Sequence, residues 1–121
     1  FRRDLLQVDP AVFMPRQQAM DTKYAKPEVD VWAASASYYN MLTGTFPKNF
    51  RMGVNPWKVI VGESAVPIND RDVNIPKSLA SVIDRALCEQ PKIGYQSASA
   101  LRKDVVAALD DDLRAAMKGV L

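Results

Sequence analysis

Residues 27–44, which read PEVDVWAASASYYNMLTG, decide the fold class. The opening proline suits the first turn of a helix, and Glu28 and Asp30 favour a helix N-terminus. After Asp30 the stretch carries no charge, so every side of the predicted helix is apolar, small or uncharged. A helix of that kind is usually buried on all faces. We therefore expect residues 29–42 to form a buried central helix that Gly44 ends in a left-handed conformation.

Shorter helices are predicted on both sides of this stretch. Residues 16–20 suit one helical turn, and an asparagine followed by proline predicts a helix over residues 55–62. Ser78 is the predicted N-cap of an amphipathic helix. Ser97 is the predicted cap of a last helix with Leu101, Val105, Ala108 and Leu109 inward, and the aspartates at 110–112 would break it. Two segments interrupted by prolines are expected to be loops: 10–15 and 63–77. Strand signals are weak, so the predicted class is all-α.

The composition predicts one globular domain of 121 residues, with 48% hydrophobic and 25% charged residues. A net charge of +2 predicts no strong attraction to nucleic acid or to an anionic membrane. The absence of histidine excludes Ser-His-Asp and Cys-His catalysis and zinc sites built on histidine. Cys88 is the only cysteine, and we expect it to be a small buried hydrophobe. No run of about 18 apolar residues predicts a membrane span, so we expect a cytoplasmic chain.

Several short motifs follow one another in an order that resembles the C-terminal lobe of protein kinases. Residues 30–47 contain DVW, YNMLTG and FP and are similar to the pattern D-V-W-S-x-G-x-x-x-Y-E-M-L-T-G-x-x-P of kinase helix F. Upstream, residues 13–18 (FMPRQQ) resemble the Y-M-A-P-E-Q stretch that closes the activation segment. Downstream, residues 75–87 resemble helix H, and residues 89–98 resemble the D-P-x-x-R-Y-x-S-A turn before helix I. The combination is typical of the eukaryotic-like serine/threonine kinases of bacteria.

The resemblance implies an all-α partial kinase C-lobe, with helices EF, F, G, H and I around a buried helix F. Residues 1–20 would form the end of the activation segment and helix EF, and residues 21–121 the remainder of the same domain. Asp30 matches the helix F acid that accepts hydrogen bonds from the catalytic loop, and Trp32 matches an anchor of the same helix. An ordinary acid at a helix N-terminus is the alternative interpretation of Asp30.

The segment before residue 16 has two interpretations of equal weight. Phe13, Met14 and Pro15 match the loop that receives the substrate residue after the phosphoacceptor, and they would then line a substrate groove. The same three side chains would also serve as a hydrophobic plug.

The chain departs from the family at a pair of linked positions. In the family the Glu of A-P-E and the Arg of D-P-x-x-R form a buried ion pair that clamps the activation segment to the lobe. The matching positions in this chain are Gln17 and Gly94. Losing both partners avoids the cost of about 3–5 kcal/mol for one unpaired buried charge. The threonine that opens the family's substrate loop matches Pro10, which has no hydroxyl. These changes are typical of a degenerate kinase, or pseudokinase.

The motifs that carry phosphoryl transfer are absent: there is no G-x-G-x-x-G, no H-R-D and no D-F-G. We therefore expect no catalytic, cofactor-binding or metal site, and Mg-ATP binding only in an intact parent kinase. The predicted function is that of a kinase C-lobe fragment without phosphotransfer of its own. One alternative is a natural C-lobe-only pseudokinase that binds a protein substrate or regulator. The other is an unrelated small helical adaptor.

Two expectations concern partners. In the family, helix E covers helix F, and it would lie upstream of residue 1. A helix over residues 29–42 without that cover would expose an apolar patch, which predicts a homodimer, a domain swap or a co-folded partner such as the N-terminal part of a kinase domain. We expect Trp57 to pack on its own domain, and the alternative is an exposed anchor for a docking partner.

Overall fold

The computed structural model describes residues 10–21, 23 and 26–118. The predicted segment 1–20 is therefore described only from Pro10 onward. Over the described residues the chain is all-α, with six α-helices, one short 3-10 helix and no strand. The elements, in chain order, are η1 (Pro10–Phe13), α2 (Arg16–Met20), α3 (Pro27–Thr43), α4 (Pro56–Gly62), α5 (Ile68–Arg71), α6 (Lys77–Ala86) and α7 (Ala98–Lys118).

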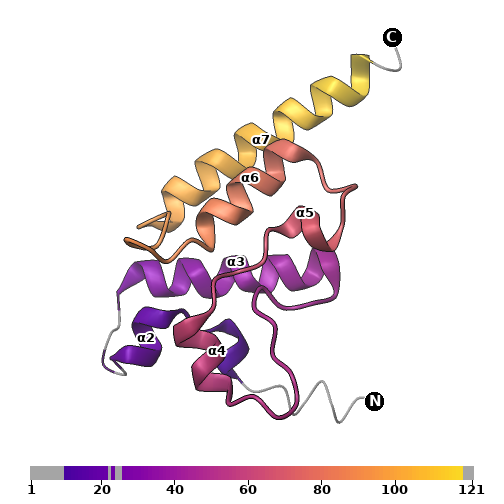
Figure 1. Cartoon of the computed structure of the whole chain (residues 1–121). Coiled ribbons are helices and arrows are strands. Elements are labelled where there is room, and N and C mark those ends of the chain that lie inside the picture. The colour runs from indigo at the N-terminus through magenta and orange to yellow at the C-terminus, as the bar shows by residue number, and fades with distance from the viewer. Residues whose placement is uncertain (1–9, 22, 24–25, 119–121) are drawn as a thin grey trace.

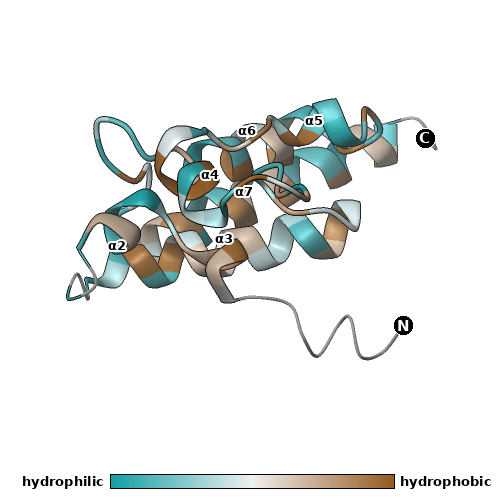
Figure 2. Ribbon diagram, turned by 60° about the horizontal axis from the view of Figure 1, so that its bottom comes forward, coloured by the Kyte–Doolittle hydropathy of each residue, from teal (hydrophilic) through white to brown (hydrophobic). Residues whose placement is uncertain are grey.

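Helix α3 runs through the middle of the molecule and separates two groups of helices (Figure 1). Helices α6 and α7 lie side by side on one side of it, and α2, η1 and α4 lie on the other. The short α5 contacts both α3 and α6. Coloured by hydropathy, the helices carry brown, apolar stretches that face the interior and teal stretches at the surface (Figure 2). This arrangement makes α3 the element that joins the two groups.

Only one side of α3 is buried, so the prediction of burial on all faces is wrong. Trp32, Ala36 and Tyr39 are fully buried, whereas Ala34 is exposed and Met41 is 78% exposed. The reason is that the described helices cover α3 on the buried side and leave the side of Ala34 and Met41 open. The predicted end of the helix is confirmed, because Gly44 has φ 75 and its N–H bonds to an α3 carbonyl.

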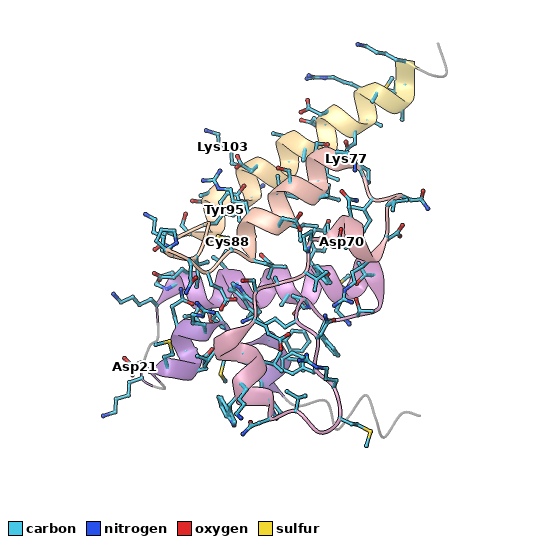
Figure 3. The ribbon with its side chains drawn as sticks, viewed as in Figure 1. Asp21, Asp70, Lys77, Cys88, Tyr95 and Lys103 are labelled. Carbon is cyan, nitrogen blue, oxygen red and sulfur yellow. The ribbon has the colours of Figure 1, made fainter. Side chains whose placement is uncertain are left out.

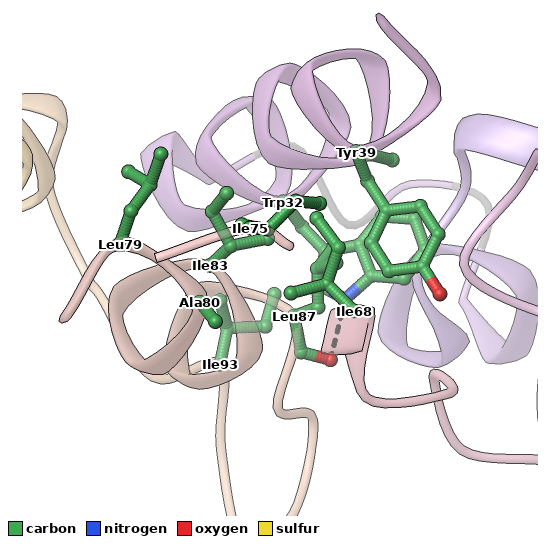
Figure 4. Close-up of a cluster of buried hydrophobic side chains, with 10 residues drawn as sticks. Trp32, Tyr39, Ile68, Ile75, Leu79, Ala80, Ile83, Leu87 and Ile93 are labelled. Carbon is green, nitrogen blue, oxygen red and sulfur yellow. Dashed lines mark hydrogen bonds between the residues drawn. The ribbon is translucent and has the colours of Figure 1, made fainter. Parts of the chain in front are cut away.

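The core forms where α3 meets α5, α6 and the loops beside them (Figure 4). Burying each large side chain of this cluster contributes about 1.5–3 kcal/mol. Trp32 and Tyr39 each carry one polar group, and both groups form hydrogen bonds inside the core. The indole Nε1 of Trp32 donates to the carbonyl of Leu87 at 3.1 Å, at the end of α6. The hydroxyl of Tyr39 donates to the carbonyl of Val66 at 2.8 Å. These two bonds fix the register of α3 against the second half of the chain. The cluster comprises Trp32, Ala36, Tyr39, Ile68, Ile75, Leu79, Ala80, Ile83, Leu87 and Ile93.

Two predicted caps are confirmed and one is wrong. The Asn55 side chain accepts from the N–H of the second residue of α4, and the Ser97 hydroxyl accepts from the N–H of Ala100 at 3.2 Å. Ser78 is not a cap, because α6 begins at Lys77 and the Ser78 hydroxyl donates to the carboxylate of Asp112. That bond also explains why the predicted break at residues 110–112 does not occur. Asp112 faces α6, and Asp110 and Asp111 are exposed to solvent.

Two predicted loops contain short helices instead. The segment 10–15 begins with η1, closed by a bond from the N–H of Met14 to the carbonyl of Ala11. The segment 63–77 contains α5, because Ile68 is drawn into the core and its N–H finds an acceptor in the Asp84 carboxylate at 2.9 Å.

Three side chains predicted to be inward are exposed. Cys88 follows the last turn of α6 and lies at the surface, where its thiol donates to the carbonyl of Gln90. Leu109 is 45% exposed, because it lies about 100° around α7 from the buried Ala108. Trp57 is 49% exposed in the first turn of α4, although Val59 and Ile60 of the same helix are buried.

Candidate functional site

The segment from η1 to α2 packs against α3 and α4. The ring of Phe13 meets that of Phe46 edge to face, with 5.7 Å between centroids and 79° between planes. Pro15 is fully buried, and Met14, which precedes it in the chain, is half-buried. The three residues thus fill space between elements, as a hydrophobic plug does. A substrate groove at these residues stays a prediction.

Beside this segment lies an ion pair that is almost completely shielded from solvent. The Nζ of Lys48 is 2.8 Å from Oε1 of Glu89, and the two side chains are 1% and 5% exposed. The Nζ of Lys48 also donates a hydrogen bond to the carbonyl of Ile60 at 2.7 Å. The same Nζ lies 5.4 Å from the ring centroid of Trp32. Burial lowers the pKa of Lys48, and the Glu89 carboxylate opposes that shift. The ammonium group therefore depends on its partner to stay charged inside the fold.

Glu89 also holds the start of α2. Its Oε2 accepts from the backbone N–H of Arg16 at 2.5 Å, and its backbone carbonyl accepts from Nε2 of Gln17 at 2.8 Å. A carboxylate that accepts the N–H of a first-turn residue is favourably placed at a helix N-terminus. We name the set of Arg16, Gln17, Lys48 and Glu89 the buried clamp. It joins α2, the loop before α4 and the turn after α6, which lie far apart in the sequence.

The structure places the two predicted lost-clamp positions in different surroundings. Gln17 is part of the buried clamp, although its Oε1 has no hydrogen-bond partner among the described residues. Gly94 lies against α6, where a Cβ atom would stand 1.8 Å from the backbone oxygen of Arg85. Only a residue without a Cβ fits there without a shift of the backbone. The cation of the clamp comes instead from Lys48.

A cavity of about 380 Å³ opens beside the buried clamp, lined by Arg16, Asp84, Cys88, Glu89 and Gln90 among others. Nε of Arg16 is shielded from solvent and has no hydrogen-bond partner among the described residues. Burial raises the pKa of Asp84, and the hydrogen bond from Ile68 partly offsets this effect. The lining of the cavity mixes apolar and polar groups, and the carboxylates of Asp84 and Glu89 accept hydrogen bonds from the backbone N–H groups of Ile68 and Arg16. Among the described residues no group of three or more potential metal-binding side chains comes together.

The remaining predicted residues lie apart from the clamp or beside it. Asp30 is exposed in the first turn of α3, and its carboxylate makes no hydrogen bond within the described part of the chain. Trp32 is a core residue and borders the clamp through Lys48. Trp57 lies exposed on α4. Cys88 and Tyr95 lie near the turn after α6, and Asp21 lies at the end of α2 (Figure 3).

Sequence reasoning missed Lys48 and the role of Glu89. Lys48 directly follows the phenylalanine–proline pair that ends one kinase-like motif, and Glu89 begins the motif before the last helix. No spacing rule connects them, because only the folded chain brings position 48 to position 89.

Comparison with known proteins gives a partial similarity. No protein-family model matches the chain. Over 84 residues, 67% of its length, the chain is 33% identical to "Serine/threonine-protein kinase PknD" of Chlamydia abortus. The chain spans only 9% of the length of that protein. The described part of the chain contains no helix with the length and apolar content needed to cross a membrane.

Proposed function

We propose that this chain is a partial C-lobe of a serine/threonine protein kinase-like domain, without phosphotransfer of its own. The observation that carries the proposal is the 33% identity with a bacterial kinase over two thirds of the chain. In this assignment α2 is helix EF, α3 is helix F, α4 is helix G, α6 is helix H and α7 is helix I. Residues 1–20 then end an activation segment, residues 21–121 complete the lobe, and the chain works in the bacterial cytoplasm.

The buried clamp supports this assignment. In the family an ion pair ties the end of the activation segment to the turn before helix I, and the clamp joins the corresponding segments here. The motif can also be aligned one residue earlier, with Pro15 on the family's proline, and Arg16 then stands at the glutamate position. In that alignment a base has replaced the family's acid, and Glu89 supplies a carboxylate from the opposite segment.

The role that fits these features is to hold or present a protein. The chain has none of the motifs that bind nucleotide or magnesium, so phosphoryl transfer would need the rest of a kinase domain. Residues 13–15 would contact a substrate segment in such a complete domain, with Asp30 positioned to receive the catalytic loop.

A chimera tests the assignment. Residues 10–118 would replace the corresponding segment of an intact bacterial serine/threonine kinase, and an unrelated helical segment of equal length would serve as control. We expect the chimera to fold and to bind Mg-ATP, since the replaced part contributes no nucleotide contact, whereas the control fails. A chimera no better folded than the control would refute the assignment. The isolated chain should show no Mg-ATP binding by calorimetry. Tight binding would refute the proposal that the chain has no phosphotransfer activity of its own.

A second candidate is a natural C-lobe-only interaction module, and the exposure of Trp57 favours it. Tryptophan is enriched among the residues that contribute most of the binding energy at protein interfaces. Selection of peptides from a display library on the wild-type chain, followed by counter-screening on Trp57→Ala, tests this candidate. We expect the selected peptides to lose binding to the variant, and retention of binding would exclude Trp57 as the anchor.

A further inference from the structure

The cavity of about 380 Å³ beside the buried clamp has the size of a site for a small molecule. Three segments form its wall: the start of α2, the loop between α4 and α5, and the end of α6 with the turn after it. Leu87 and Glu89 of this wall are buried, whereas Ser64, Cys88 and Gln90 are exposed. The wall thus combines core residues with surface residues, as in a pocket that a ligand enters from solvent.

Arg16 brings to this cavity a positive charge that the fold leaves without a partner. Its guanidinium group forms no hydrogen bond and no ion pair within the described part of the chain, and its Nε is shielded from solvent. Glu89 is already occupied, since its Oε1 pairs with Lys48 at 2.8 Å and its Oε2 accepts the backbone N–H of Arg16. A half-buried guanidinium group in this state is placed to pair with an anion such as a carboxylate.

Asp84 brings a negative charge to the same cavity. Its Oδ1 accepts the N–H of Ile68 at 2.9 Å, but its carboxylate forms no ion pair with any described residue. Arg16 and Asp84 therefore line one cavity without pairing with each other. Burial raises the pKa of Asp84, so a cation beside its carboxylate would be favourable.

A ligand that matches both charges carries a carboxylate and an ammonium group. Its carboxylate would pair with Arg16 and its ammonium group with Asp84, so that each charge of the wall gains a partner. A simple anion would be repelled by Asp84, and a simple cation would be repelled by Arg16. The wall also contains apolar residues against which the methylene groups of such a ligand can pack. These residues are Ala65, Pro67 and Leu87.

We propose that this cavity binds a small zwitterion of the amino-acid class, with Arg16 holding its carboxylate and Asp84 its ammonium group. Arg16 belongs to α2 and Asp84 to α6, so the bound zwitterion adds an ionic link between the two segments that Glu89 already connects. The proposal does not depend on the kinase-like assignment, since it rests on the charges and the lining of this cavity alone.

A series of ω-amino acids tests the ligand class. Glycine, β-alanine, 4-aminobutanoate and 6-aminohexanoate would be titrated into the ¹⁵N-labelled wild-type chain, with the amide signals of residues 87–90 followed by NMR. Butanoate and butylamine, which carry one charge each, are the matched controls for 4-aminobutanoate. We expect at least one amino acid to bind with a dissociation constant of about 1 mM or lower, and its single-charge analogues to bind about tenfold more weakly or less. No binding by any amino acid at about 10 mM, or equal binding of the analogues, would overturn the proposal.

Two substitutions locate the site on the chain. Arg16→Gln removes the cation but keeps its backbone N–H, and Asp84→Asn keeps an oxygen that accepts the N–H of Ile68. We expect each substitution to weaken binding of the amino acid about tenfold or more. Arg102→Gln and Asp110→Asn, which change exposed residues of α7, should leave binding unchanged. Wild-type affinity in either cavity variant, or an equal loss in the α7 variants, would overturn the proposal. Circular dichroism checks that each variant stays folded, and the ligand series on the wild-type chain tests the proposal without them.

Discussion

Replacing Glu89 by glutamine would leave the Lys48 ammonium group inside the fold without a counter-charge. Both side chains are almost fully buried at an N–O separation of 2.8 Å, so water cannot take the place of the lost carboxylate. Removing one partner of a buried ion pair costs about 3–5 kcal/mol. A 121-residue chain is expected to have about 6–18 kcal/mol of total stability. The variant should therefore fold but unfold at a urea concentration about 1–3 M lower.

A double-mutant cycle measures the pair itself. Lys48→Met should also destabilise the chain, because Glu89 then keeps only the backbone N–H of Arg16 as a partner for its charge. In the double variant no buried charge is left unpaired, so its loss should be smaller than the sum of the two single losses by about 3 kcal/mol or more. Urea denaturation followed by circular dichroism gives all four stabilities.

The exposed pair of Arg51 and Glu63 is the matched control. Its charged atoms are 2.9 Å apart, but the two side chains are 50% and 35% exposed. Glu63→Gln should therefore shift the urea midpoint far less than Glu89→Gln does, because solvent screens the exposed pair. If Glu89→Gln costs no more than this control, or if the cycle is additive within about 0.5 kcal/mol, the reasoning from burial is refuted.

Three further predictions concern single positions. Burial and the hydrogen bond to Asp104 raise the pKa of Tyr95 to about 12, so stability should be intact below about pH 10 and fall as the pH rises towards 12. Burial also raises the pKa of Tyr39, so more than one phenol should ionise late in an absorbance titration, and the loss of the latest step in Tyr95→Phe would assign it to Tyr95; a common pKa near 10 for all tyrosines would contradict this. Gly94→Ala should destabilise the chain by about 2 kcal/mol or more, because its Cβ would meet a backbone oxygen. Gly62→Ala, with open space around it, should be close to neutral in the same melts, and equal effects would contradict the steric argument. Asn55→Ala should cost about 1 kcal/mol through the lost cap of α4, and an unchanged denaturation midpoint would show that the cap contributes nothing.

The local features of the fold could be predicted because each rests on neighbouring residues. Gly44 ends α3 because glycine tolerates the positive φ of that position, and Asn55 begins α4 because its side chain reaches an N–H two residues away. Helix existence and class follow from such signals. The predictions at Ser78 and at residues 110–112 failed for a shared reason: the hydroxyl and one carboxylate bond to each other across α6 and α7.

Burial was the least predictable property, because it depends on neighbours that a local pattern does not contain. The uncharged stretch 29–42 predicts burial on every face, yet Met41 lies open, since no described helix covers that side. Cys88 and Trp57 are apolar or small residues that the tertiary arrangement leaves at the surface for the same reason.

The candidate site also combines features that follow from the sequence with features that depend on the tertiary structure. By itself the sequence determined the helical class, the position of the central helix and the absence of nucleotide-binding motifs. Only the tertiary structure decided that Lys48 and Glu89 meet in the interior and that α2 is fastened through them. A cap or a helix end is an interaction between near neighbours, whereas a buried ion pair between distant positions exists only once the core has brought them together.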